Sequence, residues 1–223
     1  MTPMTYTGHV DPGGPTQVRE LGRATIHKMA VSEMHNNVYL LTCHATGQQL
    51  LVDAADDPER CLALVAEGTG RLDHLVTTHR HWDHVRALEA VATATGAKTY
   101  AGADDAPSLP VAPQVTLEQG DTIDVGELTV DVIHLRGHTP GSVALAWHDP
   151  DGVVHLFTGD ALFPGGVGNT SNPGQSFEAL YGDVTERIFA VYPDDTWFYP
   201  GHGDDSTLGA ERPHLEEWRE RGW

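Results

Sequence analysis

Short apolar segments recur along the chain, many of them bounded by Gly, Pro, Asp or Asn. Segments of this length and composition are typical of β-strands. In the first half of the chain they lie at residues 24–31, 37–43, 48–52, 72–77 and 98–101. In the second half they lie at residues 121–125, 128–135, 142–148, 153–158 and 196–199. The pattern therefore predicts many short strands.

Four segments outside these strands have helical features. Asp57 followed by Pro58 is a typical helix start, and Gly68 is placed to end that helix. Apolar residues at helical spacing predict further helices at residues 85–96, 177–191 and 208–221. Strands and helices that alternate in two similar halves predict an α/β fold, in which sheets pack inside helical layers.

Composition narrows the range of functions. The chain has 223 residues, which suits one domain. Its net charge of -19 argues against binding to nucleic acid or to an anionic membrane surface. Cys43 and Cys61 are too few for a disulfide scaffold and are expected to be buried thiols. No apolar run is long enough for a membrane span, and residues 1–23 do not have the pattern of a signal peptide. We therefore expect a cytoplasmic protein. The sequence leaves its oligomeric state open.

Four residues capable of metal binding follow the predicted strand 72–77: His79, His81, Asp83 and His84. The carboxyl end of a strand is where α/β sheets place their sites, and imidazole nitrogen and carboxylate oxygen are the usual ligands of Zn²⁺. In an extended turn His79 and His81 point the same way and can chelate one metal. Asp83, a plausible helix N-cap, and His84 lie on a first helical turn and suit a second metal.

Three more candidates each follow another predicted strand and stand beside glycine: His138, Asp160 and His202. Glycine lets the backbone approach a ligand closely. Because all these residues lie at strand ends, we expect one shared pocket. His134 lies inside a predicted strand and His35 at the entry of another, and both are interpreted as structural.

The chain resembles the metallo-β-lactamase superfamily in four motifs, which occur in the family's order: His79-x-His81-x-Asp83-His84, Gly137-His138-Thr139, Gly159-Asp160 and Gly201-His202-Gly203. Within that superfamily it is most similar to short bacterial hydrolases related to glyoxalase II, the hydroxyacylglutathione hydrolase. The resemblance implies a four-layer αβ/βα sandwich of two similar halves. Residues 24–223 would form this single domain, and residues 1–23 an N-terminal arm.

The resemblance also implies a binuclear centre of two Zn²⁺ ions, with Fe or Mn as possible replacements. It assigns one ion to three histidines and the other to a second group of three: His79, His81 and His138, then Asp83, His84 and His202. Asp160 would bridge the ions, and Asp83 and Asp160 would be the catalytic carboxylates. A metal-bound hydroxide would then cleave a small acyl thioester.

Two departures from the family concern the substrate. Few residues follow His202, so the helical C-terminal domain with which larger glyoxalase II enzymes hold glutathione is expected to be absent. Asn169 stands where such enzymes often have a cation. We therefore predict that Asn169 binds the substrate by neutral hydrogen bonds, and that the thiol is a small one other than glutathione.

Other functions stay open at this point. A persulfide dioxygenase-like enzyme would hold one iron on residues matching His79, His138 and Asp160, although Asn169-Thr170-Ser171 replaces the Arg-Thr-Asp run common in that group. Lactone hydrolysis is a further alternative. A β-lactamase is disfavoured, because such enzymes usually lack the bridging aspartate. An RNA-processing activity is disfavoured by the charge, and a metal-binding protein without turnover is the weakest hypothesis.

Overall fold

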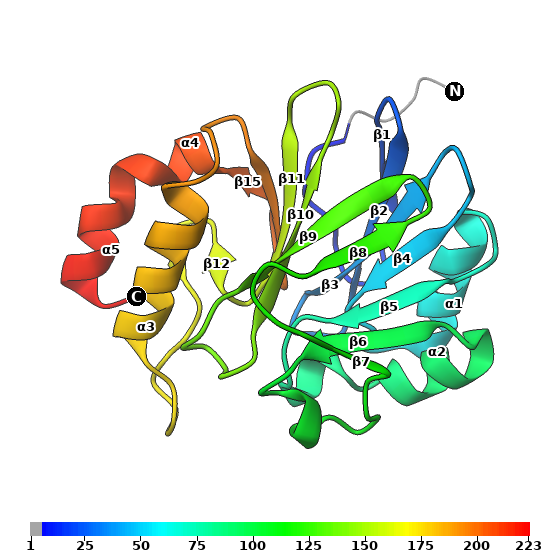
Figure 1. Ribbon diagram of the computed structural model, residues 1–223, viewed down its shortest axis with the longest axis horizontal. Coiled ribbons are helices and arrows are strands. Elements are labelled where there is room, and N and C mark those ends of the chain that lie inside the picture. The colour runs from blue at the N-terminus through cyan, green and yellow to red at the C-terminus, as the bar shows by residue number, and fades with distance from the viewer. Residues whose placement is uncertain (1–5) are drawn as a thin grey trace.

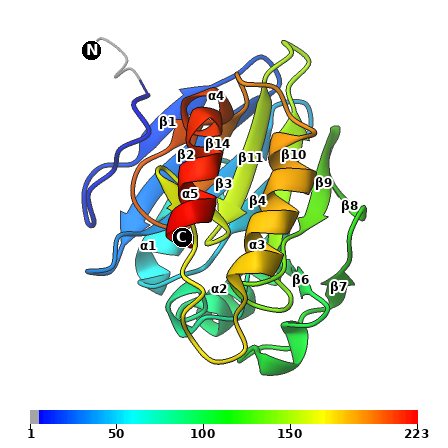
Figure 2. The same ribbon diagram turned by 90° about the vertical axis from the view of Figure 1, so that its left-hand side faces the viewer.

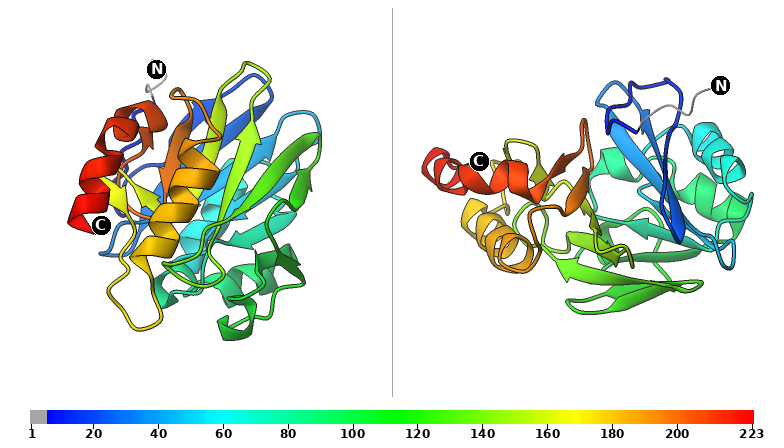
Figure 3. Two further views of the ribbon diagram at one scale, coloured as in Figure 1. Left: turned by 60° about the vertical axis from the view of Figure 1, so that its left-hand side comes forward. Right: turned by 90° about the horizontal axis from the view of Figure 1, so that it is seen from above.

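Two β-sheets lie face to face, with helices on the outer side of each, in the computed structural model, which describes residues 6–223 (Figure 1). The view from above separates the four layers most clearly (Figure 3). The predicted α/β fold and its arrangement as a four-layer sandwich are both confirmed.

The first sheet contains seven strands in chain order, antiparallel from β1 to β4 and parallel from β4 to β7. Its strands are β1 (Gln17–Glu20), β2 (Ala24–Val31), β3 (Asn36–Cys43), β4 (Gln49–Val52), β5 (His74–Thr77), β6 (Lys98–Gly102) and β7 (Val115–Leu117). The parallel part places the carboxyl ends of β4 and β5 at the same edge, where the histidine-rich segment follows.

The second sheet has the order β15-β14-β11-β10-β9-β8, in which only β11 and β14 are parallel neighbours among the described residues. Its strands are β8 (Thr122–Val125), β9 (Leu128–His134), β10 (Val143–His148), β11 (Val154–Gly159), β14 (Trp197–Pro200) and β15 (Ser206–Thr207). A small hairpin, β12 (Leu162–Phe163) and β13 (Gly166–Val167), follows β11. Its first strand begins just after Asp160.

Helices cover the outer faces of both sheets. The first sheet is covered by α1 (Pro58–Glu67) and α2 (Leu88–Thr95). The second is covered by α3 (Phe177–Val184) with its π-helical continuation Thr185–Phe189, by α4 (Leu208–Glu211) and by α5 (Leu215–Arg221). Figure 2 shows α3 and α5 in front of the second sheet. None of the helices in residues 6–223 has both the length and the apolar character to cross a membrane.

Three apolar clusters hold the layers together. The central cluster lies between the sheets and includes Leu41, Leu145 and Phe157, all fully buried. The outer clusters pack α1 and α2 on the first sheet and α3 and α5 on the second. Burial of a large apolar side chain contributes roughly 1.5–3 kcal/mol, so these layers supply most of the stability of the fold.

Local signals explain where α1 begins and ends. The Asp57 carboxylate accepts a hydrogen bond from the Arg60 backbone N–H at 3.2 Å, and the helix ends at Gly68, as the sequence predicts. The same reasoning is wrong for Asp83, which caps no helix: it lies within the 3₁₀ turn Trp82–His84, and α2 begins later, at Leu88. The Asp83 carboxylate instead accepts a hydrogen bond from the Asn36 side chain at 3.0 Å.

The N-terminal segment takes part in the first sheet. Within residues 1–23, strand β1 pairs antiparallel with β2, so the end of the predicted arm is a sheet edge. The first five residues of that predicted arm lie outside the described residues. The division into an arm, 1–23, and one domain, 24–223, stays a prediction.

Candidate metal centre

The predicted site residues come together at one edge of the two sheets. His79 and His81 follow β5, His138 follows β9, Asp160 follows β11 and His202 follows β14. Asp83 and His84 lie on the 3₁₀ turn that continues the β5 loop. Segments far apart in the sequence thus meet where strands of both sheets end.

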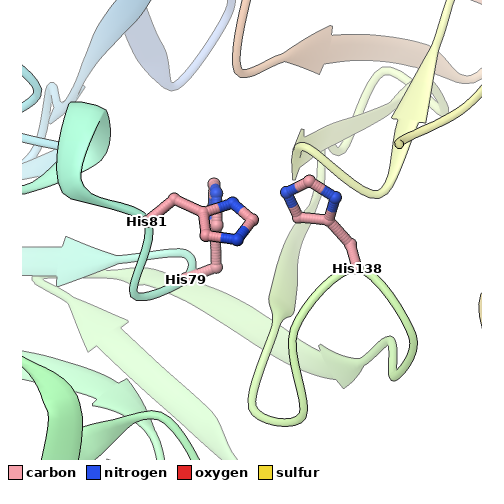
Figure 4. Close-up of side chains that lie close together, drawn as sticks. All are labelled: His79, His81 and His138. Carbon is pink, nitrogen blue, oxygen red and sulfur yellow. The ribbon is translucent and has the colours of Figure 1, made fainter. Parts of the chain in front are cut away.

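Three histidines form the first group that could hold a metal ion: His79, His81 and His138 (Figure 4). One ring nitrogen from each lies within 4.8 Å of the others. The ring centroids are 4.8 Å apart for His79 and His81, and 4.5 Å apart for His81 and His138. Nε2 of His79 and of His138 is buried and has no hydrogen-bond partner among residues 6–223.

Asp83, His84 and His202 form the second group, again with one atom of each within 4.8 Å of the others. Nε2 of His202 lies 3.3 Å from Asp83 Oδ2 and 3.1 Å from Nε2 of His84. Two imidazole nitrogens and a carboxylate oxygen therefore point at one centre. Such a donor set suits a divalent transition metal.

The Asp160 carboxylate lies between the two groups. Its Oδ2 is 3.6 Å from Nε2 of His138 and 3.9 Å from Nε2 of His79, while its Oδ1 is 3.3 Å from Nε2 of His84. Oδ1 has no hydrogen-bond partner in the described chain. A single carboxylate that reaches both groups is placed as a bridging ligand would be.

A glycine makes room for this carboxylate. A Cβ added at Gly201 would lie 2.1 Å from Asp160 Oδ1 and 2.8 Å from Cε1 of His84. Any side chain at this position would thus displace Asp160 or the histidine. The glycine beside His202 in the motif is explained by this close approach.

Backbone and side-chain oxygens fix the orientation of four histidine rings by accepting from Nδ1. The acceptors are Thr78 Oγ1 for His79 at 3.0 Å, Asp53 Oδ2 for His84 at 2.9 Å, the Asn169 carbonyl for His138 at 2.8 Å and the Met34 carbonyl for His202 at 2.8 Å. With Nδ1 as donor, Nε2 faces the centre, where it would offer its lone pair to a metal ion once the ring is neutral. Such outer contacts are typical of metal-binding histidines.

Asp53 is a site residue that the sequence analysis did not identify. Its Oδ1 accepts from the Thr78 backbone N–H and its Oδ2 from Thr78 Oγ1, both at 2.7 Å, in addition to His84 Nδ1. The backbone of Asp53 is in the left-handed region, with φ of 58°. The available signal was its position directly after the predicted strand 48–52, since the other site residues also follow strands.

Replacement of Asp53 by alanine is expected to weaken metal binding 10- to 100-fold, because His84 and, through Thr78, His79 lose the acceptor that fixes their rings. Competition with a chromophoric chelator measures the affinity. Asp73→Ala is the matched control, since Asp73 accepts the Gln49 N–H at the opposite end of the same two strands. Equal affinities for the two variants would contradict this role of Asp53.

Charge at the site favours a cation. Burial lowers the pKa of His79 well below its ordinary value, which keeps this ring neutral, as a ligand must be. Burial would raise the pKa of Asp160, but the His84 charge and contact with His202 hold it well below its usual range. Burial would likewise lower the pKa of His202, but contacts with Asp160 and Asp83 raise it to about 9. The buried carboxylates thus draw positive charge to the centre, and a divalent ion supplies it.

Other predicted residues lie at the margin. Asn169 contacts the outer side of the His138 ring by its carbonyl oxygen, while its side-chain Oδ1 accepts from the Ser171 N–H at 3.1 Å. His134 ends β9, and its Nε2 donates to the Pro140 carbonyl at 2.7 Å, which agrees with a structural role. His35 is exposed in the β2–β3 turn and belongs to none of the metal-binding groups found among the described residues.

Comparisons with known proteins agree with this architecture. The hydroxyacylglutathione hydrolase of Polaromonas sp. is 36% identical over 165 residues, which cover 74% of this chain and 60% of that enzyme. The crystal structure of ETHE1 from Myxococcus xanthus superposes with a TM-score of 0.77 at 30% identity, covering 87% of this chain and 84% of that one. The crystal structure of TTHA1623 in a di-iron-bound form has a TM-score of 0.70 at 32% identity, covering 83% and 96%.

The family profile described as the Metallo-beta-lactamase superfamily matches residues 31–202. That range includes every candidate ligand from His79 to His202 and most of both sheets. The resemblance seen in the four motifs is therefore confirmed, and the chain belongs to the metallo-β-lactamase superfamily.

Proposed function

We propose that this protein is a metal-dependent hydrolase that cleaves a small acyl thioester. The observation that carries the proposal is the Asp160 carboxylate, which lies 3.3–3.9 Å from nitrogens of both ligand groups. Seven ligand side chains exceed what one tetrahedral ion can use. The hydrolase relatives, of whose length the chain spans about 60%, support the thioester as substrate class.

The proposed ligands are those assigned from the sequence, one set of three for each ion and Asp160 for both. Their nitrogen and oxygen donors suit Zn²⁺, with iron or manganese as alternatives. When bound, two such ions lower the pKa of a water molecule and polarise a carbonyl group.

This chain's own residues orient the reactants. Asp83 Oδ2 accepts a hydrogen bond from the Asn36 side-chain amide at 3.0 Å, and this contact fixes the carboxylate beside His202. In the proposed mechanism this carboxylate would accept a hydrogen bond from the attacking water. Burial of His79 and His84 excludes bulk water from the inner side of the centre. A thiolate leaves readily, so a thioester needs little acid assistance.

A second candidate is a mononuclear iron enzyme similar to the persulfide dioxygenases. His79, His138 and Asp160 form a group of two histidines and one carboxylate, with Nε2 to Oδ2 distances of 3.9 and 3.6 Å. This set suits O₂ chemistry on iron. It leaves Asp83, His84 and His202 without a ligand role, which favours the binuclear hydrolase.

We expect about two metal ions per chain after purification without chelator, measured by elemental analysis, and hydrolysis of an acyl thioester that is lost on chelation and restored by Zn²⁺. Two ions are expected because the proposed ligands fall into two groups of three, and the Asp160 carboxylate lies 3.3–3.9 Å from nitrogens of both. A single iron per chain, with O₂ consumed when a persulfide is added, would favour the second candidate. Two bound ions without hydrolysis of any thioester would contradict the proposed substrate class.

The proposals on the kind of partner and on the cellular location rest on the sequence. The net charge of -19 agrees with a small-molecule substrate rather than a nucleic acid or membrane partner. The cytoplasmic location is likewise proposed from the sequence alone.

A further inference from the structure

We propose that a cavity between residues 165–171 and the C-terminal turn binds the thiol arm of the thioester and selects an arm without charge. This inference rests on the proposed function and adds to it a binding site and a substrate class. We call this space the arm cavity. Its lining residues are Val167, Asn169, Thr170, Ser171, Phe177, Gly222 and Trp223.

Two contacts connect the lining of the arm cavity to the segments that bear the proposed ligands. The Asn169 carbonyl accepts from His138 Nδ1 at 2.8 Å, so the residue that lines the cavity also fixes a proposed ligand. Val167 pairs with Leu162, which lies two positions after Asp160. The cavity has a volume of about 640 Å³, within the usual range of small-molecule sites. In the proposed arrangement, a substrate whose carbonyl is at the metal centre would extend its thiol arm into this space.

The lining combines aromatic rings with uncharged polar groups. Phe177 and Trp223 contribute rings, and Trp223 remains 57% exposed. Asn169 Oδ1 is occupied by Ser171, whereas Asn169 Nδ2 makes no hydrogen bond within residues 6–223 and can donate to a ligand. Thr170 adds a further hydroxyl group. Rings that cover apolar faces, beside neutral donors and acceptors, suit a hydroxylated arm.

Charge around the cavity disfavours a carboxylate arm. The lining contains no charged side chain in the described part of the protein. The nearby cation, Arg221, stacks on Trp223 with Cζ 3.7 Å from the ring centroid, and its Nη1 donates to Glu217 Oε1 at 2.9 Å. Arg221 is therefore ion-paired with Glu217, and its guanidinium packs on the Trp223 ring. An anionic arm would also meet the net charge of -19.

The test compares two thioesters with the same acyl group, one with a hydroxylated, uncharged thiol arm and one with glutathione. A methyl thioester without an arm is the third substrate. Trp223→Ala is expected to raise KM for the uncharged arm about five- to tenfold, because a ring contact is lost, and to leave kcat unchanged. The methyl thioester should react equally with both proteins. Val191→Ala, which removes an exposed apolar side chain outside this lining, should change none of these values.

A gain-of-function variant tests the charge argument. Asn169→Lys places a cation in the cavity and is expected to lower KM for the glutathione thioester about fivefold, since a charge-assisted contact replaces a neutral one. Calorimetry with the S-methyl thioethers of both thiols, which cannot be hydrolysed, gives a second readout that needs no turnover. Binding of the hydroxylated thioether should weaken in Trp223→Ala by the same factor as KM rises.

The outcomes separate this inference from the proposed function. If the wild type prefers the glutathione thioester, or if Trp223→Ala alters neither KM nor thioether binding, the arm cavity is not the site proposed. If all three thioesters resist hydrolysis with both metals bound while the hydroxylated thioether still binds through Trp223, the cavity assignment holds and the thioester reaction is wrong.

Discussion

Asp160→Ala is expected to lower thioester hydrolysis by about 10³-fold or more, with loss of bound metal. The Asp160 carboxylate lies 3.4 Å from His202 Nε2 as well as beside the first group, so its removal disturbs both ligand sets. The water activation and carbonyl polarisation that depend on the metals contribute several kcal/mol to catalysis, and each 1.36 kcal/mol corresponds to a factor of ten in rate.

The fold of this variant should persist. Asp160 lies at the edge of the sheets, whereas the apolar clusters that hold the layers contain none of the ligands. Thermal unfolding followed by circular dichroism, with chelator present, compares the proteins without the contribution of metal. Asp131→Ala is the matched control, because Asp131 is a half-exposed aspartate on β9 and contacts only His148 among its possible ion-pair partners in the described chain. Full metal content in Asp160→Ala would falsify the bridging assignment.

The fold was predictable because its signals are local. The alternation of short apolar runs with capped helical segments predicts most strands of both sheets, and the Asp57 and Gly68 signals give both ends of α1. Strand β1 was not predicted, since Gln17–Glu20 carries half-buried polar residues and acquires its structure from pairing with β2. The long-range partner, absent from any local window, determines the structure there.

The candidate ligands were predictable for a different reason. Metal chelation requires particular side chains, and His79, His81, Asp83 and His84 carry that signal within six positions. The residues that orient these candidate ligands carry no such signal in the sequence. Asp53 acts on His84 across 31 positions, and the acceptor for His202 is a backbone carbonyl, which no residue type reveals. Outer contacts of this kind become visible only in the folded chain.

A buried ion pair supports the loop that bears His202. Lys28 and Asp205 both have fully buried side chains, and Nζ donates to Asp205 Oδ1 at 2.6 Å. Nζ also donates to the carbonyls of Gly8 and Gly203, at 2.6 and 2.7 Å. One ammonium group therefore connects β2, the N-terminal segment and the residue that follows His202.

The aspartate of this pair has further partners. Asp205 Oδ2 accepts from the Tyr6 hydroxyl at 2.6 Å and from Trp197 Nε1 at 3.0 Å. These neutral donors stabilise the buried negative charge only in part. Burial raises the pKa of Asp205, whereas the Lys28 charge and the hydrogen bonds from Tyr6 and Trp197 act to lower it. Lys28 is thus the buried counter-charge that favours the carboxylate form.

Lys28→Met is accordingly expected to destabilise the protein by about 3–5 kcal/mol, since it leaves Asp205 buried without its counter-charge. Urea unfolding of the metal-free protein measures this loss. Lys98→Met is the control, because Lys98 is the other lysine of the chain and lies exposed at the start of β6.

The double variant Lys28→Met with Asp205→Asn removes the charge itself and should recover part of the loss, with a coupling free energy of about 1–3 kcal/mol. Additive losses in the double variant would mean that Lys28 acts through packing alone. A weaker metal affinity in Lys28→Met would further show that the pair holds the His202 loop in position for binding.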